Sequence, residues 1–533
     1  MRQLLLTSLL LSLPVAAKEQ PQLPDQLAAT HGYVHVAFPK GGGQVLTVKP
    51  VGKGKPQRLD TSATAHSVGN AQAFGKWLPA GRYKVAQWGL LNWNEGPEFE
   101  VQAGRVTDLG DLAAFDVGGY ATVLVPLVHE EHAGALHAAT QSFASLLTDP
   151  APITAGIAQV QPPINTNQGG TGLGLVADLL MAYDRKVNKP STREALKQAR
   201  DPAEFVRLAR AVTVPLQDEP ARLSDGTLLF PADLGQLRKR TPGGEWSSVG
   251  IDTLRQILSV EADEGRLLSG SDDGRVRESR DAGATWTELK AFARNEAVVD
   301  IDHAGGTWVV TTTQGFDDPD APRGGGLIAA AKGTPSIRMR VYTGNGADLR
   351  DLVVSKEFVI APKDQIGWLG ARGQLVDGQY YVMAGNGLQR LDIAGGQWST
   401  ITPGERISSH RVDVASGVIT ALWSQGAFSK VYVSSDKGAT WAAIGRPPYI
   451  IFDVQMDGLD KGWASRLNMG AFSSNWETYS YSPATKDWAR SGEAPFQCRL
   501  MRVSPDYPTF CITPDASVLA MREGKWEVEF SGN

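Results

Sequence analysis

Histidines and glutamates, side chains that can bind zinc, gather in one short stretch of the chain, HEEHAGALH. His129 and His132 are three residues apart, so they share one face of a helix. A zinc-protease helix instead needs H-E-x-x-H, with its two histidines four residues apart. His137 follows His132 by five residues and diverges from it on a helix. We interpret the stretch as the solvated polar start of a helix, with an adventitious metal site as the alternative.

Three further patterns resemble known sites without meeting their requirements. Residues 272–274 (DDG) and 317–320 (DDPD) offer oxygens that suit calcium, but neither matches D-x-[DN]-x-[DN]-G. Residues 169–174 (GGTGLG) lack the Lys-Ser/Thr of a phosphate loop, so we expect a flexible loop. Residues 216–533 contain two histidines, His303 and His410, and no G-x-S-x-G, so no nucleophilic triad can be assembled. We therefore expect no catalytic residue, no metal and no cofactor.

Two octets repeat one turn signature, S-x-D-x-G-A-T-W, at residues 279–286 and 434–441. An aspartate in this setting caps backbone N–H groups of a tight turn, and the glycine permits a positive φ. The tryptophan covers the hairpin with a large apolar ring. We interpret the octets as structural turns rather than as catalytic carboxylates or metal ligands. Their defining residues are Ser279, Asp281, Gly283, Trp286, Ser434, Asp436, Gly438 and Trp441.

Degenerate copies of the octet recur in the same half of the chain, mostly at spacings of about 40–50 residues. One gap of 112 residues, between Trp286 and Trp398, has room for two repeats. A turn without tryptophan at residues 331–335 is expected to divide it. The degenerate copies end in Trp246, Trp398, Trp488 and Trp526. A fixed period of this length, made of short strands, predicts a seven-bladed β-propeller over residues 216–533.

The octet is the Asp box of bacterial sialidase-like repeats, and residues 216–533 resemble the propellers built from them. Non-catalytic propellers carry the same box, among them sortilin-type receptors and propellers related to a photosystem II assembly factor. Leu267–Trp286, in which two strands flank a D-G turn before the box, resembles the repeat of the assembly-factor type. The resemblance covers about 310 residues. It implies the fold more firmly than any activity, because one fold hosts many functions.

The resemblance leaves a sialidase-like glycoside hydrolase as the alternative function. The resemblance implies that such an enzyme places three arginines, a tyrosine–glutamate pair and an aspartate around its substrate, and carries Arg-Ile-Pro ahead of the first box. The corresponding segment here, Ala221–Arg240, has no Arg-Ile-Pro. The alternative therefore requires these side chains to converge on one face of the channel, and we favour a protein that is not an enzyme.

The first 17 residues, MRQLLLTSLLLSLPVAA, predict a signal peptide. Arg2 precedes an apolar run that is too short to span a bilayer, and small residues suited to cleavage follow before Lys18. No later run reaches 18 apolar residues. We expect an exported protein, periplasmic or secreted, without a transmembrane segment.

Residues 18–128 alternate short apolar runs with turn residues, as in Tyr33–Phe38 and Tyr120–Leu127. This alternation favours a small antiparallel β-sandwich. The stretch Leu78–Leu112 resembles Ig-like or carboxypeptidase-regulatory-like modules of exported bacterial proteins.

Residues 129–215 predict a helical connector. His129–Leu147 and Leu175–Val187 have helical character and flank a Gly/Pro-rich loop. Ser191 and Asp201 are expected helix N-caps, the first in a capping box and the second followed by a proline at the first helical position.

The two cysteines, Cys498 and Cys511, are 13 residues apart, with a turn at Ser504–Pro508 between them. A hairpin brings the two flanking strands together, so in an oxidising compartment we predict a cross-strand disulfide. Two buried thiols are the alternative.

Composition narrows the function further. The 533-residue chain has a formal net charge of −5, which argues against a nucleic-acid binder. Its hydrophobic fraction of 42% suffices for packed domains, and two cysteines exclude a disulfide-dense scaffold. We therefore predict a mainly β, exported binding or scaffold protein, whose propeller face binds a protein or glycan in the cell envelope. Loop candidates for that contact are Asp317, Asp318, Asp320, Arg323 and Arg350.

Overall fold

The structure is a computed structural model. It describes residues 24–531 apart from residues 41–45, 62–71, 89–90, 93–95, 117–121, 127–131, 156–163, 166–195, 197–198, 200, 217–218, 294–295, 317–335, 365–372, 386, 424–427, 448–449, 470–473, 496–497 and 514–516. The predicted signal peptide, the loop at 169–174, the helix at Leu175–Val187 and the cap at Ser191 lie outside the described residues.

Two β-sheets form the N-terminal region. The first has the strand order β12-β10-β9-β1-β5-β4 with β11 paired to β9, and the second has the order β3-β2-β6-β7 with β8 paired to β6. The strands of the first sheet are β1 (His31–Lys40), β4 (Asp60–Thr61), β5 (Gln72–Pro79), β9 (Val106–Asp116), β10 (Thr122–Pro126), β11 (Ile153–Thr154) and β12 (Ile164–Asn165). Those of the second sheet are β2 (Leu46–Pro50), β3 (Gln57–Arg58), β6 (Gly81–Trp88), β7 (Leu91–Asn92) and β8 (Glu98–Val101).

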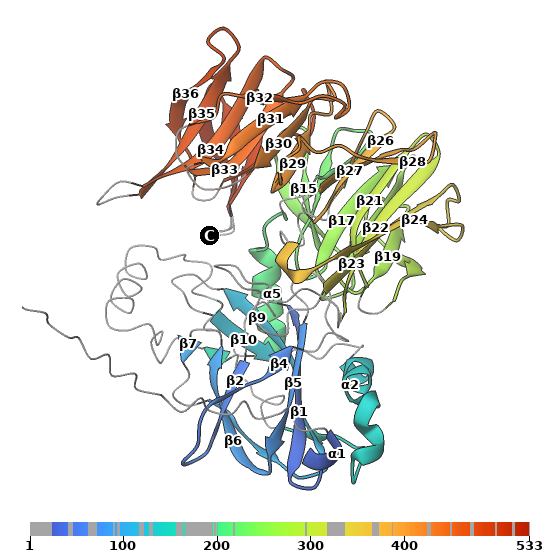
Figure 1. Cartoon of the computed structure of the whole chain (residues 1–533), viewed down its shortest axis with the longest axis vertical. Coiled ribbons are helices and arrows are strands. Elements are labelled where there is room, and N and C mark those ends of the chain that lie inside the picture. Colours follow the sequence, from blue (N-terminus) through green and yellow to red (C-terminus); the bar gives the residue numbers. More distant parts are fainter. Residues whose placement is uncertain are drawn as a thin grey trace, which may run out of the picture.

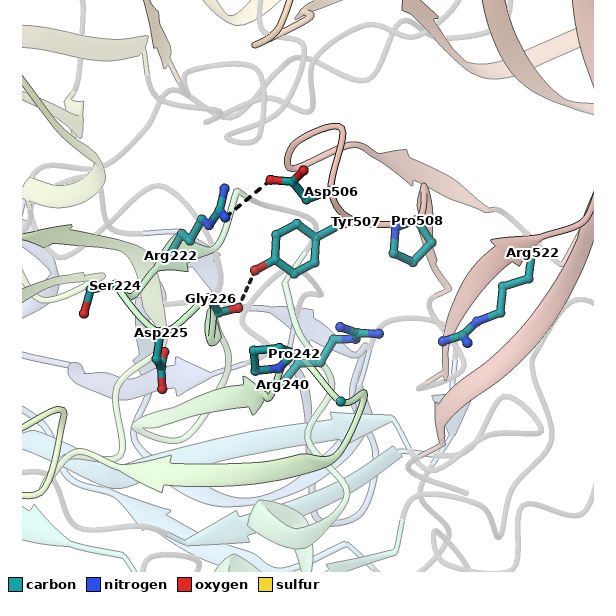
Figure 2. A pocket seen from close by; sticks show the side chains of 11 residues that line it. Arg222, Ser224, Asp225, Gly226, Arg240, Pro242, Asp506, Tyr507, Pro508 and Arg522 are labelled. Carbon is teal, nitrogen blue, oxygen red and sulfur yellow. Dashed lines mark hydrogen bonds and ion pairs between the residues drawn. The ribbon is translucent and has the colours of Figure 1, made fainter.

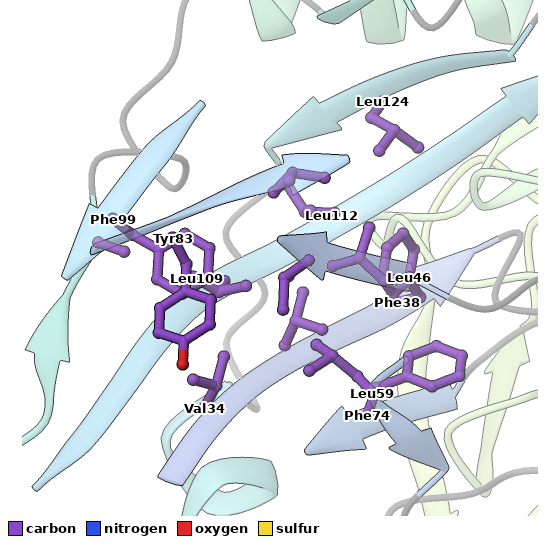
Figure 3. Packing of buried hydrophobic residues seen from close by; sticks show 14 of the residues in the cluster. Val34, Phe38, Leu46, Leu59, Phe74, Tyr83, Phe99, Leu109, Leu112 and Leu124 are labelled. Atoms are coloured by element: carbon purple, nitrogen blue, oxygen red, sulfur yellow. The ribbon is translucent and has the colours of Figure 1, made fainter. Parts of the chain in front are cut away.

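Both sheets contribute alternate side chains to one apolar core (Figure 3). Val34 and Phe38 on β1 and Leu46 on β2 are completely buried there. The pairing is not wholly antiparallel as predicted, because β1 and β9 run parallel, with Tyr33 opposite Val106. Parallel partners need a long connection, and strands β2 to β8 lie between them in the chain. The first sheet also extends past residue 128 through β11 and β12.

Short helices accompany these sheets. They are α1 (Pro24–Leu27), α2 (His132–Thr140), the 3-10 helix η2 (Gln141–Leu146) and α5 (Pro202–Ala211). The predicted N-cap of α5 is confirmed, since the Asp201 carboxylate accepts a hydrogen bond from the backbone N–H of Glu204 at 2.8 Å. The buried face of α5 packs Phe205 against Phe115 of β9, with ring centres 4.7 Å apart.

Seven four-stranded antiparallel sheets follow among the residues described from 221 to 531, and each pairs its strands in chain order. Sheet 1 contains β13 (Ala221–Arg222), β14 (Leu228–Pro231), β15 (Gln236–Arg240) and β16 (Trp246–Gly250); sheet 2 contains β17 (Ile257–Asp263), β18 (Arg266–Ser271), β19 (Arg275–Ser279) and β20 (Thr287–Ala291). Sheet 3 contains β21 (Glu296–Ala304), β22 (Thr307–Phe316), β23 (Ser336–Gly344) and β24 (Val353–Ile360); the 3-10 helix η4 (Pro362–Asp364) follows it. Sheet 4 contains β25 (Gly373–Val376), β26 (Gln379–Ala384), β27 (Gly387–Asp392) and β28 (Gln397–Thr400); sheet 5 contains β29 (Ser409–Val412), β30 (Ile419–Trp423), β31 (Lys430–Ser434) and β32 (Ala442–Ile444). Sheet 6 contains β33 (Ile450–Asp457), β34 (Lys461–Met469), β35 (Ser474–Ser482) and β36 (Asp487–Glu493); sheet 7 contains β37 (Arg499–Met501), β38 (Phe510–Ile512), β39 (Ser517–Arg522) and β40 (Lys525–Ser531).

Consecutive sheets share apolar cores, and the last sheet packs on the first. Leu258 of sheet 2, Val299 of sheet 3 and Tyr380 of sheet 4 belong to one buried cluster. Phe230 of sheet 1 and Phe510 of sheet 7 belong to another, which closes the cycle. We call this closed cycle of sheets the ring. In Figure 1 it runs from green to red beyond the blue N-terminal sheets, and it is consistent with a β-propeller.

The octets occupy the connections between the third and fourth strands of sheets 2 and 5. In sheet 3 the corresponding turn joins β23 to β24, where the Asp351 carboxylate accepts hydrogen bonds from the N–H groups of Asn345 and Gly346, at 2.7 and 2.8 Å. The divider predicted at residues 331–335 instead belongs to the connection from β22 to β23, outside the described residues. That prediction was wrong because the true turn carries no tryptophan to mark it.

Helix α5 lies between the N-terminal sheets and the ring (Figure 1). The Arg210 guanidinium donates hydrogen bonds to the carbonyl oxygens of Leu234 and Thr253, at 3.0 and 2.9 Å. Leu234 follows β14 and Thr253 follows β16. Because successive antiparallel strands alternate in direction, these connections lie at the opposite end of a sheet from the octet turns. The N-terminal region therefore occupies one end of the ring.

Arg238 on β15 holds the last turn of α5. Its guanidinium donates hydrogen bonds to the carbonyl oxygens of Arg210, Ala211 and Thr213, at 2.6–2.9 Å. The last carbonyls of a helix lack partners within the helix, so the arginine supplies them. Burial lowers the pKa of Arg238 to about 10, which leaves it charged at neutral pH.

Candidate functional site

Side chains close the ring, because no strand is exchanged between sheets 7 and 1 among the described residues. Arg240 on β15 donates from Nε and Nη2 to the two carboxylate oxygens of Glu529 on β40, at 2.6 and 2.7 Å. Both side chains are buried, and Trp246 Nε1 donates to the same carboxylate at 3.3 Å. Such a two-pronged pair sets orientation as well as contact. We call this joint between sheets 7 and 1 the seam.

A pocket of about 620 Å³ lies on the seam (Figure 2). The turns β13–β14 and β15–β16 of sheet 1 form one wall, and the connection β37–β38 and the end of β39 form the other. These turns are at the octet end of the sheets, so the pocket opens on the end that the N-terminal region leaves uncovered. The charged lining residues are Arg222, Asp225, Arg240, Asp506 and Arg522. We call it the seam pocket.

Two guanidinium groups of the seam pocket remain accessible. Arg222 and Arg522 are each 48% exposed. The Arg222 guanidinium contacts Asp506 at 3.4 Å and lies 5.3 Å from the ring centre of Tyr507. Tyr507 Oη donates across the seam to the carbonyl oxygen of Gly226. Exposed guanidinium N–H groups beside an aromatic ring suit a carboxylate on a binding partner.

Carboxylates also link the first strands of neighbouring sheets, which contact one another along the inner wall of the ring. Asp300 follows a bulge in β21 and accepts a hydrogen bond from the backbone N–H of Gly373 in sheet 4, at 3.1 Å. Asp453 follows a bulge in β33 and accepts one from Leu500 in sheet 7, at 2.9 Å. A bulge aims a side chain away from its regular direction, and here it aims a carboxylate at the next sheet.

The inner wall is acidic on the side of sheets 2 and 3. Burial, together with the neighbouring carboxylates of Asp300, Glu219 and Asp263, raises the pKa of Glu261 on β17 from its usual 4.5 to about 8. Glu261 is therefore mostly protonated at neutral pH, because burial and the neighbouring negative charges disfavour its charged form.

The serine, aspartate, glycine and threonine of the octets make the same hydrogen bonds in both copies. Ser279 Oγ accepts a hydrogen bond from the N–H of Gly283 and donates to Asp281, each at 2.8 Å. Asp281 in turn accepts from the backbone N–H and the hydroxyl of Thr285, at 2.8 and 2.6 Å. These bonds from Thr285 lower the pKa of Asp281 to about 2. Trp286 Nε1 donates to the carbonyl of Gly283 at 3.0 Å.

In the second octet Ser434, Asp436 and Gly438 repeat this arrangement, and hydrogen bonds from Thr440 lower the pKa of Asp436 to about 2. Trp441 packs on the core between sheets 4 and 5. Each octet carboxylate is thus fully engaged within its own turn.

Of the loop candidates, one lies among the described residues. Arg350 lies in the β23–β24 turn of sheet 3, the counterpart of an octet turn, and its side chain is 87% exposed and pairs with Asp348 at 3.2 Å. The remaining candidates lie outside the described residues; they are Asp317, Asp318, Asp320 and Arg323. The seam pocket was not predicted, because its walls are about 280 residues apart in the chain and neither wall carries a motif.

His132 has a role that the sequence analysis missed. Its Nδ1 lies 2.6 Å from Asp111 and its Nε2 lies 2.6 Å from Asp108, so carboxylates of β9 engage both ring nitrogens. Hydrogen bonds with Asp108 and Asp111 raise the pKa of His132 to about 10. The imidazolium thus ties the start of α2 to the first sheet, whereas we expected a solvated start. His129 and its two glutamates lie outside the described residues.

Two tyrosine–glutamate pairs bear on the glycosidase alternative. Tyr342 donates to Glu296 at 2.9 Å beside Arg340, and Tyr479 donates to Glu477 at 3.3 Å beside Arg466 and Arg490. Burial raises the pKa of both tyrosines, that of Tyr342 to about 12. A nucleophilic tyrosine needs the opposite shift. Among the described residues neither pair binds three arginines.

The predicted disulfide is present between Cys498 and Cys511. The two Cα atoms are 5.3 Å apart, and both residues are completely buried beside Trp463 and Trp526. It links the start of β37 to β38 within sheet 7.

Two searches of the described residues were negative. They contain no group of three or more His, Cys, Asp or Glu side chains placed to hold a metal ion. Within the same residues no helix has both the length and the apolar character needed to cross a bilayer.

No protein-family model matches the chain, and no curated protein matches it. Among solved structures, the computationally designed Ika8 protein is similar with a TM-score of 0.37 and 10% identity, over 60% of this chain and 88% of that chain. YCF48 bound to D1 peptide is similar with a TM-score of 0.36 and 12% identity, over 53% of this chain and 84% of that chain. Likenesses this distant assign neither a family nor a function.

Proposed function

We propose that the chain is a seven-bladed β-propeller that acts as a non-catalytic binding or scaffold protein, exported to the cell envelope or beyond. The seven four-stranded sheets and their closed cycle of contacts support the blade count. The signal-peptide pattern of residues 1–17 supports export. Neither of the two described tyrosine–glutamate pairs meets the requirements of the alternative, a sialidase-like glycoside hydrolase.

The seam pocket carries the proposal. It is polar, it is large enough for several side chains of a partner, and it opens on the uncovered end of the ring. Its two half-exposed arginines, Arg222 and Arg522, offer hydrogen-bond donors to carboxylates. We therefore favour an acidic segment of a protein partner over a neutral glycan, because neutral sugars lack the carboxylates that these groups select.

The test compares what the mature chain captures from envelope extracts with what its variants capture. The pocket variant is Arg222→Gln, which keeps polarity and removes an accessible charge without touching Glu529, to which Arg522 donates a hydrogen bond. Arg280→Gln is the matched control, since Arg280 is 70% exposed on an octet turn at the same end of the ring. Arg350→Gln tests the loop candidate.

We expect the wild type and Arg280→Gln to recover the same protein and the pocket variant to lose it. Loss with Arg350→Gln alone would move the binding surface to the outer turns of sheet 3. Recovery of the same protein by the pocket variant, or repeated recovery of none, contradicts the proposal.

A further inference from the structure

The inner wall of sheets 5 to 7 carries two arginines around one carboxylate. Arg411 on β29 lies close to Asp453 on β33, and Arg499 on β37 directly precedes Leu500, whose backbone N–H donates to Asp453. The Arg411 Nη2 atom is 3.6 Å from Asp453 Oδ2, which is longer than a hydrogen bond. The two carboxylate oxygens of Asp453 accept hydrogen bonds from the backbone N–H groups of Val454 and Leu500, at 3.0 and 2.9 Å. Two cations thus share one anion that is already engaged.

Arg499 is the less satisfied of the two. Its Nε is buried and has no hydrogen-bond partner, and no hydrogen bond from its guanidinium joins it to another residue that the structure describes. Burial lowers the pKa of Arg499, and Arg411 adds to that effect against the attraction of Asp453. A buried donor without an acceptor is costly, so natural proteins retain one mainly where something else supplies the acceptor.

The surroundings define what could supply it. The Arg499 guanidinium lies 5.2 Å from the ring centre of Phe452, and Trp476 meets the edge of that ring at 5.3 Å. His410 beside Arg411 stays neutral, because burial lowers its pKa to about 3. The local charge excess is therefore close to one, from two arginines and one aspartate.

We propose that Arg411, Arg499 and Phe452 form a binding site for a carboxylate that is attached to an apolar group. The guanidinium forks match the two oxygens of a planar carboxylate, and the aromatic floor suits the carbon skeleton next to it. A monoanion cancels the charge excess, whereas a phosphate dianion overshoots it. The acidic stretch around Glu261 and Asp300, on the other side of the ring, further disfavours polyanions.

This site is independent of the seam pocket. It lies on the first strands of sheets 5 to 7, whereas Arg222 and Arg522 belong to the outer turns of sheets 1 and 7. The disulfide at Cys498 adjoins Arg499 in the chain and holds the strand that presents it.

The test measures binding of benzoate and of inorganic phosphate to the full mature chain by calorimetry and by thermal unfolding. Benzoate is expected to bind the wild type and to raise its unfolding temperature, as any ligand of the native state does. Arg499→Met is expected to weaken benzoate binding at least about tenfold. Arg499→Lys keeps the charge without the forked guanidinium group, so its affinity for benzoate is expected to lie between those of the wild type and Arg499→Met.

Arg280→Gln, on an exposed octet turn outside both sites, is the matched control and is expected to bind benzoate like the wild type. Arg499→Met is expected to fold, because it removes a poorly paired charge and retains the aliphatic stem. If Arg499→Met does not fold, Arg411→Gln is measured in its place and is expected to weaken benzoate binding as well. Absence of benzoate binding, equal binding by Arg499→Met, or tighter binding of phosphate than of benzoate overturns the proposal. None of these outcomes depends on whether the seam pocket captures a protein.

Discussion

Two joints of the ring use the same device in opposite electrostatic settings. Asp300 and Asp453 each follow a bulge in the first strand of a sheet, and each accepts a backbone N–H from the first strand of the next sheet. Asp300 also accepts the hydroxyl of Tyr380 at 2.7 Å and lies among carboxylates. Asp453 lies near Arg411, and its charge also acts on Arg499.

The difference separates what the fold requires from what it leaves open. Both joints require an acceptor for a buried N–H, because an unpaired one costs about 1–3 kcal/mol. Neither joint requires a particular charge beside that acceptor. Charge is therefore free to differ around the ring, and the unbalanced charge near Arg499 is a feature that packing alone does not explain.

The largest expected effect comes from replacing Asp453, whose two oxygens accept two backbone N–H groups, by asparagine, which keeps one acceptor oxygen and loses the charge. Asp453→Asn leaves two arginines without a carboxylate, so we expect it to lower the free energy of unfolding by about 2 kcal/mol or more. Asp300→Asn removes a charge from a cluster of like charges, so we expect a loss smaller by at least about 1 kcal/mol. Urea unfolding at pH 7 measures both. Equal losses of unfolding free energy in the two variants would mean that the charges around Asp453 and Asp300 do not affect stability differently.

A smaller effect is expected in the pH dependence of stability. The pKa of Glu261 is about 8 in the folded state against 4.5 ordinarily, so the folded chain binds the extra proton between these values. Its contribution to stability is full below about pH 4.5, falls as the pH rises toward 8, and is constant above.

Glu261→Gln is expected to remove this slope. The measurement is the free energy of unfolding of wild type and variant at each pH, and the difference between the two isolates the contribution of Glu261. Asp300→Asn is expected to move the slope to lower pH, because one of the neighbouring charges that raise the pKa of Glu261 is gone. Asp436→Asn, in an exposed octet turn, is the control and is expected to leave the slope in place. A slope unaffected by Glu261→Gln would contradict the assignment.

The smallest effect is expected at the two octets. One lies in sheet 2, which carries Glu261 of the acidic cluster, and the other lies in sheet 5, which carries Arg411. Asp281→Asn and Asp436→Asn break the same hydrogen bonds in exposed turns, so we expect two small and equal decreases in melting temperature. Both carboxyls have a pKa near 2, so their contribution is present above pH 3.8 and is lost only as the pH falls through about 2. Scanning calorimetry of both variants checks this, and clearly unequal decreases would show that the turns are not equivalent.

The parts of the fold that sequence reasoning predicted depend on contacts between near neighbours in the chain. Asp281 binds Thr285 four residues away, and Asp201 binds Glu204 three residues away, so residue types and spacing suffice. The disulfide spans one hairpin. The repeat period can be read from such turns wherever a tryptophan marks them. In sheet 3 the turn has no tryptophan, and there the predicted position of the turn was wrong.

The candidate sites depend on distant contacts, which residue types alone do not reveal. His132 meets Asp108 and Asp111 from 24 and 21 residues away, and a parallel pair of strands aligns β9 with β1. Arg240 meets Glu529 from 289 residues away. The bulge that turns Asp453 toward the next sheet has no sequence signal of its own.

The sequence by itself determined the turns, the helix cap, the disulfide and the mainly β character of the chain, because short-range hydrogen bonds and alternating apolar residues act within single hairpins. Only the tertiary structure decided that sheets 7 and 1 meet at Arg240 and Glu529, and that Arg411 and Arg499 share Asp453. Those encounters arise when the cycle of sheets closes, since closure brings strands from different repeats side by side.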